Sequence, residues 1–419
     1  MTSPARGAAD RGTFRSLRVR NFRLFAAGHA VSQSGSWLQL VALSWVALTL
    51  TGRGTALGWM VAVTFAPLVL LAPWVGSVTD RSDTRRLLIA VHIAGTAHAI
   101  TLAALVLGGG LTVPLLYLMA LGHGIVHAAE SPVRRAFVAE TVDQADLANA
   151  VSLTSTLSAA CRVAGPALGG VLLVGPGAGW CFVANAVSSV LALFGLVLIR
   201  RAELAGTAPD ADGGDGSVRA GLAYAWSVPE LRVTLLATAV VCTLGFNHPV
   251  ITPLLAERTF GGGAGLYTLL YTALAGGGIA GGLLAARRRD VDLGHLARAT
   301  LAFGGATALV AMAPTVAWAT AATVVAGATG LLVVCTSAAL LQLRCEPALR
   351  GRMMALSAVV VAGGTPIGAP LLGWLSETAG PRAGLATAAA GCAITGACVL
   401  TRGGARTPMT LALPRQEPA

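Results

Sequence analysis

The stretch GSVTDRSDTRR runs from Gly76 to Arg86 and lies between two long apolar segments. It contains Asp80, then Arg81, and then the pair Arg85 and Arg86. Charges this dense in so short a connection are expected where two membrane helices meet and their water-exposed ends lock and unlock. An acid at a helix end can also bind the positive N-terminus of a neighbouring helix. We therefore predict that these five residues form a gating latch. The alternative, an ordinary bias of arginine toward one membrane face, explains the guanidinium groups but not Asp80.

The composition indicates an integral membrane protein. Of 419 residues, 55% are hydrophobic and 11% are charged, whereas a soluble domain carries about 25% charged residues. The apolar residues occur in stretches of roughly 20 or more, the length that a helix needs to cross a bilayer. The short alternating segments of a transmembrane barrel are not visible. We therefore predict an all-α fold with twelve transmembrane helices.

The predicted spans have similar lengths and short connections. In the first half of the chain they cover residues 22–48, 56–79, 86–108, 112–133, 147–174 and 178–199. In the second half they cover residues 231–256, 265–286, 294–313, 316–342, 353–377 and 382–401. The acid of the latch would then face the N-terminus of the eleventh span.

Arginine sets the predicted topology. The net charge is +11, and the chain contains no lysine. A nucleic-acid-binding protein would gather its arginines on one soluble face, whereas here they fall in alternate connections between the spans. Positively charged connections stay in the cytoplasm. We therefore predict a multi-pass protein of the cell membrane, with both termini cytoplasmic and no nucleic-acid partner.

A polar segment divides the chain into two comparable parts. Residues 202–220 are rich in Gly, Ala and Asp. We predict a cytoplasmic linker here, between six-helix bundles at 1–201 and 221–419, the second ending in a short cytoplasmic tail. RVAGPALGG at 162–170 is echoed by GTPIGAPLLG at 364–373. Paired bundles of this kind bind substrate between them near the midplane. A pump driven by a P-loop ATPase is excluded, because that loop needs a lysine.

The fifth span contains a second motif. Arg162 is followed by Gly165, Pro166, Gly169 and Gly170. Glycines four residues apart leave one helix face without side chains, so a neighbouring helix can approach closely. Proline frees a backbone carbonyl and bends the helix, which is tolerated where protein or a cavity covers it. A resemblance of these residues to a fifth-helix motif of exporters and antiporters favours a role of this antiporter-like motif in transport, and general packing of small residues is the alternative.

The fourth span carries titratable residues on one face. His123, His127 and Glu130 are spaced i, i+4 and i+7, which places them along one side of a helix. Arg162 is a candidate partner for Glu130, because an unpaired charge inside a membrane is costly. Three interpretations fit the stripe: a proton-coupling site, a structural charge pair, and a metal site with two histidine ligands, for which no further ligands are apparent.

Polar residues inside two other spans are candidates for the substrate cavity. They are His29, Gln33 and Trp37 in the first span and Asn247 and His248 in the seventh. Polar groups at membrane depth tend to face a cavity or another helix. Hydrogen bonding between helices is the alternative for each of them. In the loop after the second span, we interpret Asp83 as a solvated acid.

The two motifs resemble those of major facilitator superfamily transporters. Further segments resemble the branch that includes enterobactin-exporter-like and macrolide-efflux-like proteins: Asn21–Gly52, Ser131–Glu140, Asp146–Ala150, Gly351–Met353 and Gly363–Gly368. The resemblance implies two pseudo-symmetric six-helix bundles and proton-driven efflux of hydrophobic or amphipathic molecules such as antibiotics, siderophores or biosynthetic products. The sequence departs from the pattern in two ways. The first span contains no acid, and Ala286 stands where the second half would carry a counterpart of Asp80.

We therefore expect a secondary active exporter that exchanges protons for a small-molecule substrate by alternating access. An importer or lipid transporter of the same fold is one alternative, and a membrane sensor or scaffold that transports nothing is another. No pairing of a nucleophile with a base and no cofactor motif stands out. We expect a monomer in the lipid bilayer that is not an enzyme and uses neither cofactor nor metal.

Overall fold

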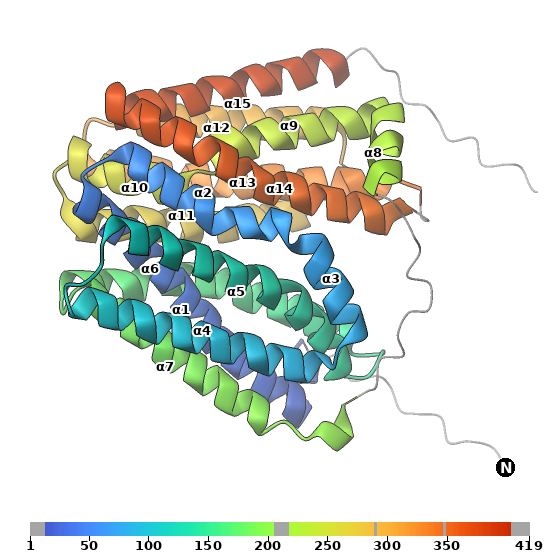
Figure 1. Cartoon of the computed structure of the whole chain (residues 1–419). Helices are drawn as coiled ribbons and strands as arrows, with labels where there is room; N and C mark the ends of the chain where they lie inside the picture. Colours follow the sequence, from blue (N-terminus) through green and yellow to red (C-terminus); the bar gives the residue numbers. More distant parts are fainter. Residues whose placement is uncertain (1–12, 205–217, 289–290, 347–348, 404–419) are drawn as a thin grey trace, which may run out of the picture.

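The computed structural model describes residues 13–204, 218–288, 291–346 and 349–403, which fold into helices joined by short turns (Figure 1). A short 3-10 helix, η1 (Arg15–Arg18), precedes the first long helix. The helices of the first half are α1 (Arg20–Thr51), α2 (Gly54–Leu70), α3 (Ala72–Arg81), α4 (Thr84–Leu107), α5 (Val113–Glu140), α6 (Leu147–Val174) and α7 (Ala178–Val197).

The second half has a similar series. The connection between the halves begins with a 3-10 helix, η2 (Arg201–Glu203), and residues 205–217 of the predicted linker lie outside the described residues. The helices that follow are α8 (Val218–Ser227), α9 (Pro229–Gly245), α10 (His248–Leu254), the π-helical turn η3 (Leu255–Thr259), α11 (Gly263–Ala286), α12 (Leu293–Ala311), α13 (Val316–Arg344), α14 (Arg350–Thr378) and α15 (Pro381–Gly403).

The long helices of the described residues lie side by side in one bundle (Figure 1). Within the described residues, nine segments are long and apolar enough to cross a membrane, and α9, α10 and η3 together count as one of them. Three further passes run beside these nine: α1, which carries several polar residues, α2 with its continuation α3, and the 19-residue α12 (Figure 1). The bundle thus has two ends. We call the end where α1 begins the Arg-rich end, because most arginines outside the helices lie there, and the opposite end the Arg-poor end.

The two halves start their third spans in the same way. Asp83 caps α4 by accepting a hydrogen bond from the backbone N–H of Arg86 at 3.0 Å. Asp292 caps α12 by accepting one from the backbone N–H of His295 at 2.7 Å. A cap of this kind stabilises a helix by about 1 kcal/mol. Asp83 also pairs with Arg201 at 2.8 Å. The interpretation of Asp83 as a merely solvated acid was therefore wrong.

Proline explains two breaks in the spans. The second span bends at Leu71, between Pro67 and Pro73, and α3 then packs against α5 of its own half. The seventh span is interrupted between α9 and α10, where Pro249 cannot donate the hydrogen bond that would continue the helix. A break at membrane depth is tolerated where surrounding protein covers the freed backbone groups.

The halves meet mainly through two helix pairs, α2 with α14 and α6 with α11. Glycines allow this approach: a Cβ atom at Gly54 would lie 2.6 Å from the carbonyl oxygen of Gly373, and one at Gly170 would lie 2.6 Å from Oγ1 of Thr268. Near the Arg-poor end, Val250 and Leu254 of α10 belong to the same apolar cluster as residues of α1, α2 and α5. One apolar core therefore crosses the boundary between the halves at this end.

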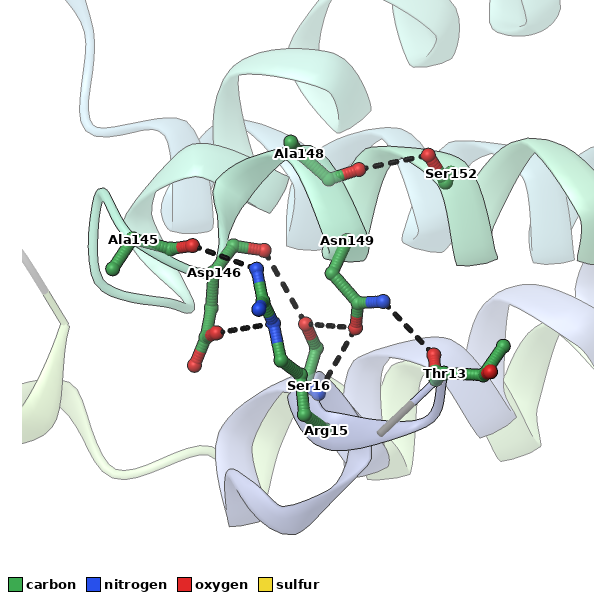
Figure 2. A network of polar contacts seen from close by, with 8 residues as sticks. All are labelled: Thr13, Arg15, Ser16, Ala145, Asp146, Ala148, Asn149 and Ser152. Carbon is green, nitrogen blue, oxygen red and sulfur yellow. Dashed lines mark hydrogen bonds and ion pairs between the residues drawn. The ribbon is translucent and has the colours of Figure 1, made fainter. Parts of the chain in front are cut away.

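The start of α6 is anchored to the segment before α1 (Figure 2). Arg15 forms an ion pair with Asp146 at 2.8 Å and donates a hydrogen bond to the carbonyl oxygen of Ala145 at 2.9 Å. The buried hydroxyl of Ser16 donates to Oδ1 of Asn149 at 2.7 Å, and the amide of Asn149 donates to the carbonyl oxygen of Thr13 at 2.8 Å. These bonds fix the helix that carries Arg162.

Candidate functional site

A small polar cavity lies inside the first half, between α1, α4, α5 and α7. Its volume of about 30 Å³ is room for about two water molecules. The polar residues that line it are Ser32, Ser36, Gln39, His92, His98, His123, His127, Glu130, Asn185 and Ser189. Polar groups gathered so densely inside a membrane bundle are costly unless they pair or serve a function.

Gln39 joins three helices at this cavity. Its side-chain oxygen accepts a hydrogen bond from the amide of Asn185 on α7 at 2.6 Å. Its nitrogen lies 2.9 Å from Nδ1 of His123 on α5. Because an amide nitrogen can only donate, Nδ1 of His123 accepts and the ring carries its proton on Nε2. The tautomer of His123 therefore follows from the orientation of Gln39.

The imidazole rings form a row along the cavity. The ring centres of His98 and His123 are 6.0 Å apart, and those of His123 and His127 are 6.3 Å apart with nearly parallel planes. Nε2 of His98 donates to the carbonyl oxygen of Met119 at 2.8 Å, which leaves Nδ1 of His98 able to accept a proton. Two water molecules in the cavity are enough to link rings at these spacings.

Glu130 ends this row and is buried. An oxygen of its carboxylate lies 3.8 Å from Nε of Arg134, one turn along α5. Nε of Arg134 is buried and makes no hydrogen bond within the described residues, so the pair is incomplete. His92 and His127 also lie near enough to interact electrostatically with the carboxylate. The prediction that Arg162 pairs with Glu130 was wrong, because Glu130 pairs with Arg134.

The candidates for the substrate cavity separate into two places. Nε2 of His29 lies 2.9 Å from the hydroxyl of Ser158, and the ring of His29 stacks on Phe25 with centres 6.0 Å apart. His29 therefore lies inside the first half, beside Glu130, and not between the halves. Trp37 does lie toward the boundary between the halves: the guanidinium carbon of Arg162 is 5.0 Å from the centre of its ring.

Aromatic residues of both halves continue from Trp37 and Arg162. Tyr271 of α11 interacts electrostatically with Arg162. The rings of Tyr267 and Tyr271 meet edge to face with centres 6.0 Å apart, and Tyr267 stacks on Trp45 of α1 at the same distance. Two aromatic residues of the second half thus contact or approach groups of the first half, between the middle of α6 and the Arg-poor end of α1.

The candidates of the seventh span lie at the break between α9 and α10. Asn247 is buried, and its amide donates to the carbonyl oxygen of Thr243 at 2.6 Å. Its oxygen has no hydrogen-bond partner within the described residues. The ring of His248 meets Phe246 edge to face, with centres 6.1 Å apart. Gln33 is buried on α1.

The glycines of the fifth-span motif face two different neighbours. A Cβ atom at Gly165 would lie 2.5 Å from Cβ of Trp37 on α1, and Gly169 faces Leu38 of the same helix. Gly170 faces Thr268 of the second half. Pro166 lies inside α6 and is buried. The motif therefore brings α1 and α11 close to α6 on either side of Arg162.

The arginines of the predicted latch bind within the first half. Arg85 donates to the carbonyl oxygens of Leu196 and Val197, at the end of α7, at 3.0 and 3.2 Å. Arg86 pairs with Asp83 at 3.5 Å. Gly76 and Arg81 lie on α3, and the side chain of Asp80 lies outside what the structure describes. The role of this acid stays a prediction.

Comparison with known proteins decides the family. A family model of transmembrane secretion effectors, MFS_3, matches residues 11–407. The chain belongs to this family of the major facilitator superfamily. Members of the family are transporters, so the predictions of a multi-pass membrane transporter and of a protein that is not an enzyme are both confirmed.

Two relatives of this chain are bacterial transporters. The staphyloferrin A transporter of Staphylococcus aureus is 26% identical over 246 residues, which cover 58% of this chain and 62% of that protein. The uncharacterised MFS-type transporter YfiS of Bacillus subtilis is 25% identical over 219 residues, 51% of either chain. The matches thus span less than two thirds of the length of these relatives.

Solved structures share the fold of this chain. A bacterial homologue of the human lysosomal transporter Spinster, in an inward-facing and occupied conformation, superposes with a TM-score of 0.72 at 16% identity, covering 94% of this chain and 98% of that one. A D-xylose–proton symporter gives a TM-score of 0.68 at 12% identity, covering 93% and 97%. The predicted all-α major facilitator fold is confirmed, and the nine apolar spans within the described residues are consistent with the twelve predicted helices.

Several residues of the polar network around this cavity were not predicted from the sequence. Gln39, Asn185 and Arg134 each bind a predicted residue or its partner. Asn185 and the neighbouring Ser188 and Ser189 are polar residues within the apolar α7, which is a signal of the kind used for the first span. Only the rotation of the helices shows that they face Gln39.

Proposed function

We propose that this secretion effector exports a hydrophobic or amphipathic small molecule in exchange for protons. The family description as secretion effectors and a relative named for transport of staphyloferrin A support a small-molecule substrate that leaves the cell. The Arg-rich end lies in the cytoplasm in this proposal, because arginine-rich connections are retained there. The Arg-poor end then faces outward.

The main support for proton exchange in this proposal is the burial of Glu130. Its carboxylate is buried beside a cavity with room for water, its ion pair with Arg134 is incomplete, and histidines continue from it along α5. A group that holds or releases a proton needs a low-dielectric site, a nearby charge that is not fully committed, and a path for the proton. The burial of Glu130, its incomplete pair with Arg134 and the row of histidines support this role for the network inside the first half.

The proton site and the contacts between the halves are in different places. His123, His127 and Glu130 face α4 and α7 of their own half, whereas Trp37 and Arg162 lie toward α11 of the other half. The helices α1 and α6 link them, since Gln39 and Trp37 both belong to α1 and His29 bonds to Ser158 of α6. Protonation of the network would change the position of α1 and α6, and thereby the boundary between the halves.

Purified protein in liposomes tests this proposal. A transported compound is first found by expressing the protein in a pump-deficient bacterium and testing resistance against a panel of compounds. We then expect substrate-dependent proton release from wild-type liposomes, and we expect Glu130→Gln to reduce it to the level of empty liposomes. Glu203→Gln, which removes a surface carboxylate of η2, is the matched control and should leave proton release unchanged.

The same assay separates the alternatives. Full accumulation driven by a pH gradient in the Glu130→Gln protein would make Glu130 a structural residue. Accumulation that follows the inward proton gradient would show an importer. A sensor or scaffold would release no protons with any compound of the panel.

A further inference from the structure

Arg162 is an unusual charge for a membrane helix. It lies near the middle of the 28-residue α6, and its side chain is nevertheless exposed. Within the described residues its electrostatic partners include no carboxylate, and its guanidinium N–H groups make no hydrogen bond. A charged side chain at membrane depth is costly unless it is paired or serves a function. Arg162 is therefore a candidate for contact with something that the chain itself does not supply.

The surroundings of Arg162 come from both halves. The guanidinium carbon of Arg162 lies over the ring of Trp37 on α1, at 5.0 Å from the ring centre. Tyr271 of α11 approaches from the second half and is within electrostatic range. A guanidinium group carries its five N–H donors in its own plane. The contact with Trp37 uses none of these donors, and within the described residues they make no hydrogen bond.

A polar stripe runs along α6 from this position toward the Arg-rich end. Ser155 and Ser152 precede Arg162 by seven and ten residues, so all three share one helix face. Both serine side chains are exposed, as Arg162 is. On α1, Gln33 lies one turn before Trp37, again toward the Arg-rich end. The exposed polar groups on this side of Arg162 therefore belong to α6, since Gln33 is buried.

We propose that Arg162 binds a carboxylate of the transported molecule between the two halves, with Trp37 and Tyr271 covering the apolar or aromatic part beside it. A planar guanidinium fork matches a carboxylate with two parallel hydrogen bonds. The flanking indole and phenol rings favour flat, apolar groups next to that carboxylate. The substrate class is therefore an amphipathic organic acid.

This assignment rests on the proposed function and adds a reason for coupling. Trp37 and Arg162 belong to the first half and Tyr271 to the second. A molecule held by all three contacts both halves at once, so its binding free energy depends on how the halves are arranged. Neutralising Arg162 with a carboxylate also removes the cost of an unpaired charge.

Equilibrium binding to the purified full-length protein in lipid nanodiscs tests the site without any transport. The probes are 1-naphthoate and its uncharged counterpart 1-naphthamide, which share the aromatic part and differ in the carboxylate. We expect wild-type protein to bind naphthoate about tenfold or more tightly than naphthamide, the effect of hydrogen bonds to a charged group. Arg162→Gln should abolish this preference, Arg162→Lys should retain part of it, and Arg298→Gln, at an exposed arginine of α12, should leave it unchanged.

A second measurement needs no variant. Phenylglyoxal modifies accessible arginines, and mass spectrometry reports the modified positions. We expect naphthoate, but not naphthamide, to protect Arg162 of the wild-type protein, while Arg298 reacts equally in all samples. Equal affinity for the two probes, a preference that survives in Arg162→Gln, or an unprotected Arg162 would each overturn the assignment. Selective binding without proton-coupled transport would uphold the site and refute the proposed function.

Discussion

The two ends of the α2–α14 pair differ in what holds them. At the Arg-poor end, the carboxylate of Glu377 on α14 accepts a hydrogen bond at 2.8 Å from the backbone N–H of Thr55, in the first turn of α2. Arg258 of η3 donates to the carbonyl oxygen of Gly52 at 2.6 Å. At the Arg-rich end, α3 bends away from α14 toward α5, as Figure 1 shows. The pair is joined across the halves at one end and separated at the other.

The difference has a simple geometric origin. The helices of this pair are antiparallel, so the C-terminal end of each lies opposite the N-terminus of its partner. Glu377 near the end of α14 uses this arrangement to bind the positive start of α2. Asp80, near the end of α3, has the corresponding place in the sequence relative to the start of α14. We propose that the two acids act in turn, one for each closed end.

The largest effect is expected from breaking the closed end. A Cβ atom at Gly58 would collide with the carbonyl group of Ala369 on α14. We expect Gly58→Val to reduce transport tenfold or more, because overpacking of about 1–3 kcal/mol forces α2 and α14 apart. Gly276→Val is the control, since a Cβ atom there would meet nothing within 4 Å. Equal transport by both variants would show that the close contact at Gly58 is dispensable.

A smaller effect is expected from loosening the Arg-rich end of the first half. Asp83 both caps α4 and pairs with Arg201. Its replacement in Asp83→Ala should lower the free energy of unfolding by about 1–2 kcal/mol, most of it from the lost cap. Asp292→Ala, which removes the equivalent cap of α12, is the matched comparison. Thermal denaturation of the purified proteins measures both, and no loss in Asp83→Ala would contradict the role of the cap.

The smallest effects are shifts of the conformational equilibrium, and replacing the acids of the two ends should shift it in opposite directions. Glu377→Gln weakens the joined end and should shift the conformational equilibrium about two- to fivefold toward separation there, the range for a charge at a helix N-terminus. Asp80→Asn should shift it the other way and impair turnover while substrate binding in detergent persists. Distances between spin labels at positions 110 and 314, in a cysteine-free background, report the Arg-poor end. Glu257→Gln, at an exposed acid of the same end, is the control. Shifts of the same sign would refute the alternating roles.

The fold was largely predictable because membrane crossing leaves a strong signal. Apolar stretches of bilayer length predicted most helix bounds within a few residues, although the fourth span continues to Glu140 and not only to residue 133. The glycines of α6 correctly indicated close helix packing. The break in the seventh span was not predicted, because residues 231–256 were expected to form one helix, although Pro249 and Pro253 stand within this apolar stretch. The apolar stretches and the glycines are local features, so the sequence carries them directly.

The partners of the polar residues were less predictable. Glu130 was assigned to Arg162 because both are charges inside spans, yet Arg134 lies one turn away on the same helix and forms the pair. His29 was expected in the substrate cavity, but α1 is rotated so that it bonds to Ser158 inside the first half. Such pairings depend on helix rotation, which is set by packing across the whole bundle and leaves no local pattern.

The anchor before α1 has a practical consequence. Ser16 is fully buried against Asn149 and Asp146, and Arg15 neutralises Asp146 (Figure 2). Trimming the chain past Ser16, a routine step before crystallisation, would leave the first turn of α6 without these bonds and free to fray. Removal of the residues before α1 would then weaken the binding of the ligand at Arg162, because Arg162 lies about four turns further along α6.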